Sequence, residues 1–194
     1  DQSPLRDWRG KVATYRDEKV DGSNWFEDNP FVQNDDVSLK AQLGTLRADG
    51  GGDEPESLLD ALHIVSSIGQ TEKGTQEIDP YKWRYRSDAA RVVVVFTDAT
   101  YHPTMSYSVG SGGTVNDVVN KLMAEKIILI LYAPDEACYD DLEAADKCVW
   151  ERIQSVSGSY AKGLEEYTKD RTNFQNALVN LAKSVSTSVP APEL

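Results

Sequence analysis

Two groups of acidic residues carry the chemistry that this sequence could perform. Asp98 follows the apolar run 92–96 with one residue between them, and a second acidic stretch, 53–56, follows three consecutive glycines. Carboxylates gathered at one place can bind a hard cation through oxygen ligands, or can act as an acid and a base in catalysis. The same residues could instead serve structure alone, as turn residues, helix caps or partners of a helix dipole.

The run 92–96 predicts the element that positions Asp98. All five of its residues are β-branched or aromatic, which is typical of a strand buried on both faces in the middle of a parallel sheet. The segment 127–132 shows the same pattern, so we expect these two strands to be adjacent and parallel. A charged residue in place of Val94 is then expected to abolish folding, because an unpaired buried charge costs several kcal/mol.

The predicted helices and strands alternate along the chain, which favours the α/β class with a doubly wound, mostly parallel sheet and helices on both faces. In such a sheet the strand ends and the loops that precede helices share one edge, where ligands bind. We therefore expect Asp98 to lie near Asp53 and Glu56. Residues 1–188 are expected to form one domain, and residues 189–194 a tail.

The remaining elements are predicted from apolar spacing and from caps. A strand is expected over 12–15, and a turn with a short edge strand over 20–34. Helices are expected after Asp35 or Asp36, after the acidic stretch 53–56 with Pro55 in the first turn, after Thr114, and from 147 to about 156. A short strand over 157–162 and a closing helix follow. The expected apolar helix faces are Leu39, Leu43 and Leu46; Leu58, Leu59, Leu62 and Val65; Val115, Val118, Val119 and Leu122; and Phe174, Leu178, Leu181 and Val185.

The charge balance narrows the class of partner. The 194 residues carry a formal net charge of -12, which argues against nucleic acid and anionic membrane surfaces as partners, because both need a basic face. No apolar run approaches the roughly 20 residues that a membrane-spanning helix needs. The two cysteines, Cys138 and Cys148, could form a disulfide or remain thiols, because the sequence does not reveal the compartment.

Three motifs occur in an order that resembles a known family. They are Val-Ala-Thr-Tyr-Arg-Asp at 12–17, Gly-Gly-Asp-Glu-Pro-Glu at 51–56 with Asp60-Ala61 after it, and Phe-Thr-Asp-Ala-Thr-Tyr-His at 96–102. Together with the α/β pattern they resemble the von Willebrand factor A domain, or I domain, and most closely its integrin β-subunit type. The resemblance covers nearly the whole chain.

The resemblance implies a function and a site. Glu56 and Asp98 would belong to a metal-ion-dependent adhesion site that binds Mg²⁺, or Mn²⁺ or Ca²⁺, and Asp53 would lie beside it at an adjacent cation site. The open coordination position of the metal would take an acidic side chain from a protein partner, so the domain would be a binding module and not an enzyme. Two alternatives stay open: a Mg²⁺-dependent hydrolase or phosphotransferase that uses Asp98, and a metal-free interaction domain. His102 is expected to be a solvated loop residue.

One motif of the family has no counterpart here. The family's first strand carries Asp-x-Ser-x-Ser, whereas residues 1–5 lack the last serine and follow no apolar strand. We therefore expect the chain to begin just after the family's first helix. A separate segment would supply the missing strand, between the strands at 12–15 and 92–96. Without that segment, cation binding is expected to be weak or absent.

Overall fold

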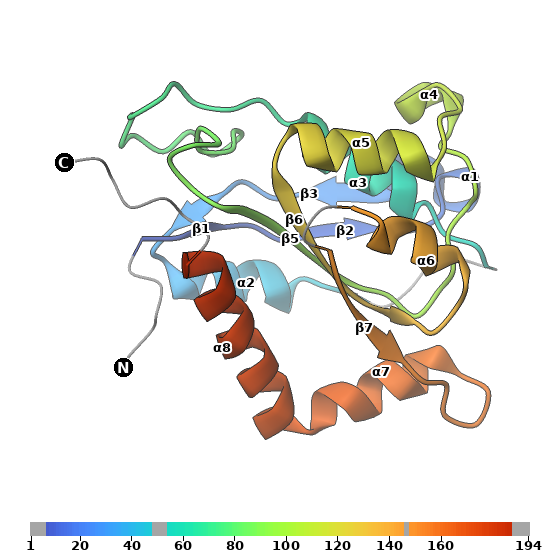
Figure 1. Ribbon diagram of the computed structural model, residues 1–194. Helices are drawn as coiled ribbons and strands as arrows, with labels where there is room; N and C mark the ends of the chain where they lie inside the picture. Colours follow the sequence, from blue (N-terminus) through green and yellow to red (C-terminus); the bar gives the residue numbers. More distant parts are fainter. Residues whose placement is uncertain (1–6, 48–53, 146–147, 188–194) are drawn as a thin grey trace.

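A three-stranded parallel sheet forms the centre of the protein. The computed structural model describes residues 7–47, 54–145 and 148–187 (Figure 1). The strands β5 (Arg91–Phe96), β6 (Ile127–Pro134) and β7 (Val149–Ile153) lie in the order β5-β6-β7. Arg91 lies opposite Ile127, and the parallel register continues to the end of β5. The predicted pairing of the strands at 92–96 and 127–132 is therefore confirmed.

Helices lie on both sides of this sheet (Figure 1). On one side are α3 (Leu58–Ser67) and α5 (Val115–Ala124), with the short helices α4 (Tyr107–Gly110) and α6 (Cys138–Glu143) near them. On the other side are α7 (Tyr160–Lys169) and α8 (Arg171–Thr187). The predicted α/β class is confirmed at this level, as a three-stranded parallel sheet flanked by helices.

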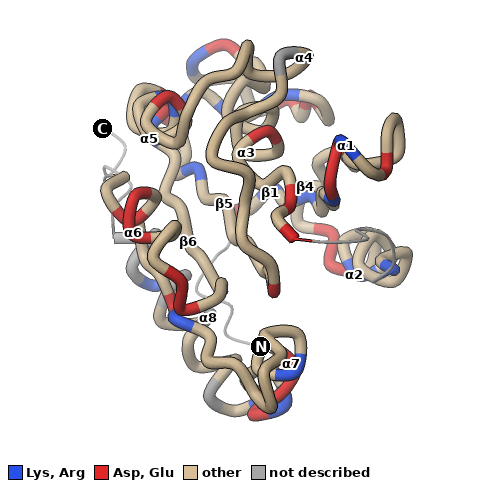
Figure 2. Tube along the Cα trace, turned by 90° about the vertical axis from the view of Figure 1, so that its right-hand side faces the viewer, with Lys and Arg blue, Asp and Glu red and all other residues tan. Residues whose placement is uncertain are grey.

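The N-terminal part adds two small antiparallel sheets. In one, β1 (Arg9–Gly10) pairs with β4 (Val32–Gln33), and in the other β2 (Ala13–Tyr15) pairs with β3 (Phe26–Asp28). The helix α1 (Glu18–Asp21), a 3-10 helix (Gly22–Asn24) and α2 (Asp36–Gly44) complete this part. Figure 2 shows β1 and β4 on the side of β5 that faces away from β6. In the described ranges, β5 pairs with β6 alone.

The burial of the two apolar strands differs from the prediction in one respect. The strand β6 is buried along its length except at the half-buried Ile128, as expected. In β5, however, Val94 is 39% exposed and Phe96 is 43% exposed, so the prediction that this strand is buried on both faces is wrong. The reason is that β6 has a neighbour on each side, whereas β5 forms the edge of the described sheet. A charge at Val94 is therefore no longer expected to abolish folding.

Aromatic side chains connect the exposed end of β5 to the C-terminal helices. The rings of Phe96 and Tyr132 stack with their centroids 4.7 Å apart, and Phe174 from α8 meets Phe96 edge-on at 5.7 Å. Tyr167 from α7 lies 5.7 Å from Tyr132. Such aromatic pairs contribute beyond their buried area, so this cluster fixes α7 and α8 against the sheet.

Two helix starts follow the capping rules on which they were predicted. Asp35 caps α2, because its carboxylate accepts a hydrogen bond from the Ser38 N–H at 3.0 Å. Thr114 and Asp117 form a capping box at the start of α5. The apolar face predicted after Asp35 is not buried, however, since Leu43 is 50% exposed and Leu46, which lies beyond the end of α2, is 40% exposed.

Three local predictions were wrong. Residues 149–153 form β7 instead of part of a helix, because they pair with β6 and bury Trp150 and Ile153. Residues 157–162 form a turn and the start of α7, with Ser157 in the left-handed region at a φ of 52°. Pro55 precedes α3 instead of lying in its first turn, since the helix starts at Leu58. The predicted tail, 189–194, lies outside the described residues.

Both cysteines are free thiols, which answers the question left open by the sequence. Cys138 and Cys148 are half-buried and pack against the central core cluster. Burial, followed by the nearby charge of Glu143, raises the pKa of the Cys148 thiol to about 11. Among the helices described, none has the length and apolar character needed to cross a membrane.

We expect substitutions in β5 and in β6 to change the free energy of unfolding by different amounts. Replacing Leu131, which is completely buried in β6, by alanine should lower the free energy of unfolding by about 2–5 kcal/mol, because it leaves a cavity. Replacing Val94 by alanine should change it by about 0.5 kcal/mol or less, and Val94→Asp should still fold. Urea unfolding followed by circular dichroism measures both. A folded Leu131→Ala variant beside an unfolded Val94→Asp variant would contradict this assignment of the strands.

Candidate functional site

The two predicted acidic groups meet at the carboxyl edge of the sheet. The backbone N–H of Glu56 donates to the carbonyl of Thr100 at 2.9 Å, and the N–H of His102 donates to the carbonyl of Glu56 at 3.0 Å. These two bonds form a parallel bridge between Glu56 and Tyr101. The turn before α3 is therefore attached to the segment that follows β5. The contact places Glu56 beside residues 100–102, just after Asp98, whereas the predicted proximity of the Asp98, Asp53 and Glu56 side chains stays a prediction.

The side chains of the candidate site differ in burial. Asp98 is exposed and Glu56 is half-buried, whereas Asp53 lies outside the described residues. Both described carboxylates affect the pKa of the Tyr15 hydroxyl. Burial raises the pKa of Tyr15, and the negative charges of Glu56 and Asp98 raise it further. Glu56, Asp98 and the end of β2 thus share one electrostatic environment.

The hydroxyl of Tyr15 is an unusual feature of this edge. It is buried against the side chain of Thr97, whose hydrogen-bonding contact lowers the pKa of Tyr15. Within the described ranges, no partner meets the hydroxyl at strict hydrogen-bonding geometry. A buried hydroxyl without a partner costs free energy, so native structures usually satisfy such groups. The carboxyl ends of β2 and β5 therefore present a polar atom that a further group could bind.

The described donors fit a hard cation only in part. Glu56 and Asp98 offer carboxylate oxygens, which Mg²⁺ and Ca²⁺ prefer. No three His, Cys, Asp or Glu side chains of the described residues cluster as metal ligands. Because Mg²⁺ requires about six oxygen ligands in octahedral geometry, two carboxylates would leave most positions to water. By themselves, these two residues would bind the cation weakly.

A second polar cluster lies directly beside this site and was not predicted from the sequence. Asp17, which is 3% exposed, accepts hydrogen bonds from the Lys19 N–H at 3.0 Å, from His102 Nε2 at 3.0 Å and from Ser57 Oγ at 3.3 Å. The N–H of Glu18 in turn donates to Ser57 Oγ at 2.9 Å. A single buried carboxylate therefore connects the end of β2, the start of α3 and the segment after β5.

The prediction that His102 is a solvated loop residue is wrong. Only 9% of His102 is exposed, because Asp17 and Lys19 hold its ring on two sides. The Lys19 ammonium lies 3.2 Å from Nδ1 and can only donate, so Nδ1 accepts and Nε2 carries the proton that is donated to Asp17. A usable signal was present in the sequence: Asp17 and His102 each follow a predicted strand at its carboxyl end, so both belong to the edge that carries Asp98.

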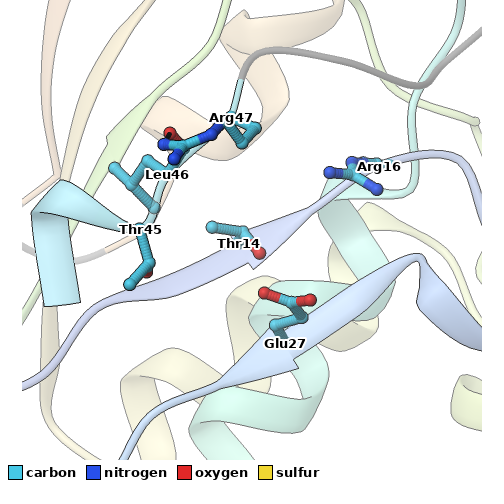
Figure 3. Close-up of a pocket in the computed structure, with 6 residues that line it drawn as sticks. All are labelled: Thr14, Arg16, Glu27, Thr45, Leu46 and Arg47. Carbon is cyan, nitrogen blue, oxygen red and sulfur yellow. Dashed lines mark hydrogen bonds between the residues drawn. The ribbon is translucent and has the colours of Figure 1, made fainter.

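A small hollow of about 200 Å³ lies over the paired strands β2 and β3 (Figure 3). Thr14 and Arg16 reach it from the first strand and its end, Glu27 from the second strand, and Arg47 from the segment after α2. The hollow contains charges of both signs and includes neither Glu56 nor Asp98. Elsewhere, Lys and Arg residues are scattered over the described part of the trace (Figure 2).

No family model matches the chain, and no curated protein matches it. The functional proposal below is therefore argued from the residues and geometry of this site, together with the motif resemblance stated above.

Because the carboxylate of Asp17 is buried and hydrogen-bonded, we expect the protein to lose stability in acid. Burial alone would raise the pKa of Asp17, but the hydrogen bonds from Lys19, His102 and Ser57 outweigh burial and lower the pKa below its ordinary value of 3.8. A carboxyl whose pKa is lower in the folded state stabilises the fold above its unfolded-state pKa, and loses that contribution as the pH falls through the folded-state value. Wild type should therefore lose stability below a pH of about 4.

The control for this prediction is Asp17→Asn, whose amide does not titrate. At a pH of about 5 we expect wild type to be more stable than Asp17→Asn by about 1.5–3 kcal/mol, the usual contribution of hydrogen bonds to a charged group. Urea unfolding at a pH of about 5 and of about 3 measures the difference between the two proteins. A difference that does not shrink at the lower pH would contradict the assigned role of the carboxylate.

Proposed function

We propose that this protein is an interaction module of the von Willebrand factor A type, which binds a protein partner through a divalent cation. The observation that supports this most directly is the attachment of the Glu56 turn to the segment after Asp98, through the two backbone hydrogen bonds of 2.9 and 3.0 Å. These bonds bring two acidic groups, 42 residues apart in the sequence, to one edge of a parallel sheet. That edge is where open α/β sheets bind ligands.

Glu56 and Asp98 would hold the cation, and Asp53 would take part in an adjacent cation site. A bound Mg²⁺ retains several waters, and a carboxylate from a partner can replace one of them. The partner would accordingly offer an acidic side chain. Asp98 suits a role in direct contact with solvent and partner because it is exposed, whereas the half-buried Glu56 suits a role at the base of the site.

The edge of β5 supports the second part of the proposal, a segment that completes the sheet. Natural edge strands are usually protected by charges, prolines or bulges. The strand β7, at the opposite edge, carries Glu151 and Arg152, whereas residues 92–96 of β5 carry no charge. An apolar run of this kind is typical of a strand with neighbours on both sides.

The finer fold proposal follows from this contrast between the two edges. A further strand between β5 and β2 would join the parallel sheet to the N-terminal hairpin, and would give the doubly wound, mostly parallel sheet that the sequence predicts. Such a strand would also cover the exposed Val94 and bring side chains to the unsatisfied hydroxyl of Tyr15. Serines and an aspartate at its carboxyl end would supply the oxygen ligands that Glu56 and Asp98 lack.

The segment proposal predicts protection of β5 by an added strand. A peptide or N-terminal fusion with an apolar strand and Asp-x-Ser-x-Ser should slow amide exchange in β5 at the N–H groups that point away from β6, because they gain hydrogen-bond partners. Exchange in β7, the other edge, should not change. Hydrogen exchange followed by NMR gives both values. A structure in which β2 pairs directly with β5 would contradict the proposal.

The metal proposal predicts that Asp98 controls cation affinity but not folding. With the segment supplied, Mg²⁺ and Mn²⁺ should bind well to wild type, and Asp98→Ala should abolish both cation binding and cation-dependent partner binding. Because Asp98 is exposed, its replacement should change the free energy of unfolding by only about 0.5 kcal/mol. Calorimetric titration of each cation into the two proteins measures the affinities.

Two outcomes would favour the alternative functions. Equal cation affinities in wild type and Asp98→Ala would contradict the metal site and would favour a metal-free interaction domain. A screen for phosphatase and nucleotidase activity in the presence of Mg²⁺ should be blank. Turnover that Asp98→Ala removes would favour the Mg²⁺-dependent hydrolase or phosphotransferase instead.

A further inference from the structure

We propose that Asp17 is a positioning residue of the candidate site: its buried carboxylate holds Ser57 and His102, and thereby fixes Glu56 relative to the end of β5. The inference that this matters for a cation rests on the proposed function, whereas the inference that Asp17 fixes Glu56 rests on contacts alone. Asp17 itself is not a proposed ligand, because its Oδ1 already accepts three hydrogen bonds from protein groups.

The first contact acts through the residue that follows Glu56. The hydroxyl of Ser57 donates to Asp17, and the Ser57 N–H donates to the carbonyl of Arg16 at 3.3 Å. Ser57 is only 2% exposed and is the N-cap residue of α3. The end of β2 therefore determines where α3 begins, and with it where the backbone of Glu56 lies.

The second contact acts through the residue that binds the Glu56 carbonyl. The backbone N–H of His102 donates to that carbonyl, while the ring of the same residue donates to Asp17. The Lys19 ammonium holds the opposite ring nitrogen. Asp17 thus binds the side chains of two residues that flank Glu56 on different segments.

The two contacts together leave the Glu56 backbone little freedom. Its N–H and its carbonyl are bonded to residues 100 and 102, and its C-terminal neighbour is held by β2. Residues that orient metal ligands in this way affect cation affinity without touching the ion. The buried cluster of Asp17, His102, Lys19 and Ser57 would accordingly act as the support of the site, and Glu56 as the residue that is supported.

The test compares Asp17→Ala with a matched variant at the other end of β5. Arg91, the first residue of β5, is 2% exposed and forms an ion pair with Glu125 at 3.2 Å. Glu125→Gln therefore disturbs a buried polar network at the end of β5 opposite to Asp98. Mn²⁺ binding to the full chain, with the Asp-x-Ser-x-Ser segment supplied, is measured by electron paramagnetic resonance. Asp17→Ala should raise the Mn²⁺ dissociation constant about 10-fold or more, and Glu125→Gln should leave it unchanged.

A second measurement separates positioning from general stability. In Asp17→Ala, amide exchange at Glu56 and His102 should accelerate by a larger factor than exchange of the β6 amides, which follows only the loss of global stability. Asp17→Asn retains an oxygen acceptor for Ser57 and the Lys19 N–H, so it should restore part of the Mn²⁺ affinity and of the protection at Glu56. A merely structural role would accelerate exchange at β6 and at Glu56 by the same factor, and that result would overturn the proposal.

Asp98→Ala, titrated in parallel, distinguishes the two proposals. If Asp98→Ala abolishes Mn²⁺ binding and Asp17→Ala leaves both the affinity and the Glu56 exchange unchanged, the positioning role is wrong and the metal site stands. If wild type and Asp98→Ala bind Mn²⁺ equally, the metal site is wrong. Faster exchange at Glu56 in Asp17→Ala would in that case still support the positioning role.

Discussion

The parallel pairing of β5 with β6 is the interaction on which the rest of the arrangement depends. It aligns the two most apolar runs of the chain over six residue pairs, from Arg91 opposite Ile127 to Phe96 opposite Tyr132. Because β6 also pairs with β7, its side chains are buried on both faces, and α5 and α7 pack against it from opposite sides. The same pairing ends β5 at Phe96, so Asp98 emerges at the carboxyl edge of the sheet.

The two edge strands of this sheet differ in how their unpaired backbone groups are protected against pairing with another strand. At β7, the charged residues Glu151 and Arg152 lie between the buried Trp150 and Ile153. Arg152 lies over the Trp150 ring and contacts three carboxylates. Such an edge is protected against pairing with another strand. The apolar residues of β5 give no such protection, and Val94 and Phe96 remain partly exposed. The sequence of β5 thus suits an interior position, which is the physical basis for proposing a strand beside it.

The sequence predicted what depends on strong local patterns. The apolar runs at 92–96 and 127–132 identified the parallel pair, and the capping residues Asp35 and Thr114 identified helix starts, because each signal is contained in a few neighbouring residues. The strand 149–153 was missed because its pattern is short and its stability comes from pairing with β6. The cluster around Asp17 was missed because its partners are 40 and 85 residues away. The strand ends indicate only that Asp17 and His102 share one edge of the sheet, and the tertiary fold shows that their side chains meet.

The candidate site combines both kinds of information. Asp98 takes its place from the strand that precedes it, which local pattern determines, whereas Glu56 takes its place from hydrogen bonds to residues 100 and 102, which only the fold provides. The buried hydroxyl of Tyr15 lies in the field of both carboxylates, in a protein with a net charge of -12. Backbone bonds and the Asp17 cluster hold the Glu56 backbone at this edge. In the proposed function, a cation would neutralise the edge and an added strand would bring side chains to the hydroxyl, so each would stabilise the arrangement that the other binds.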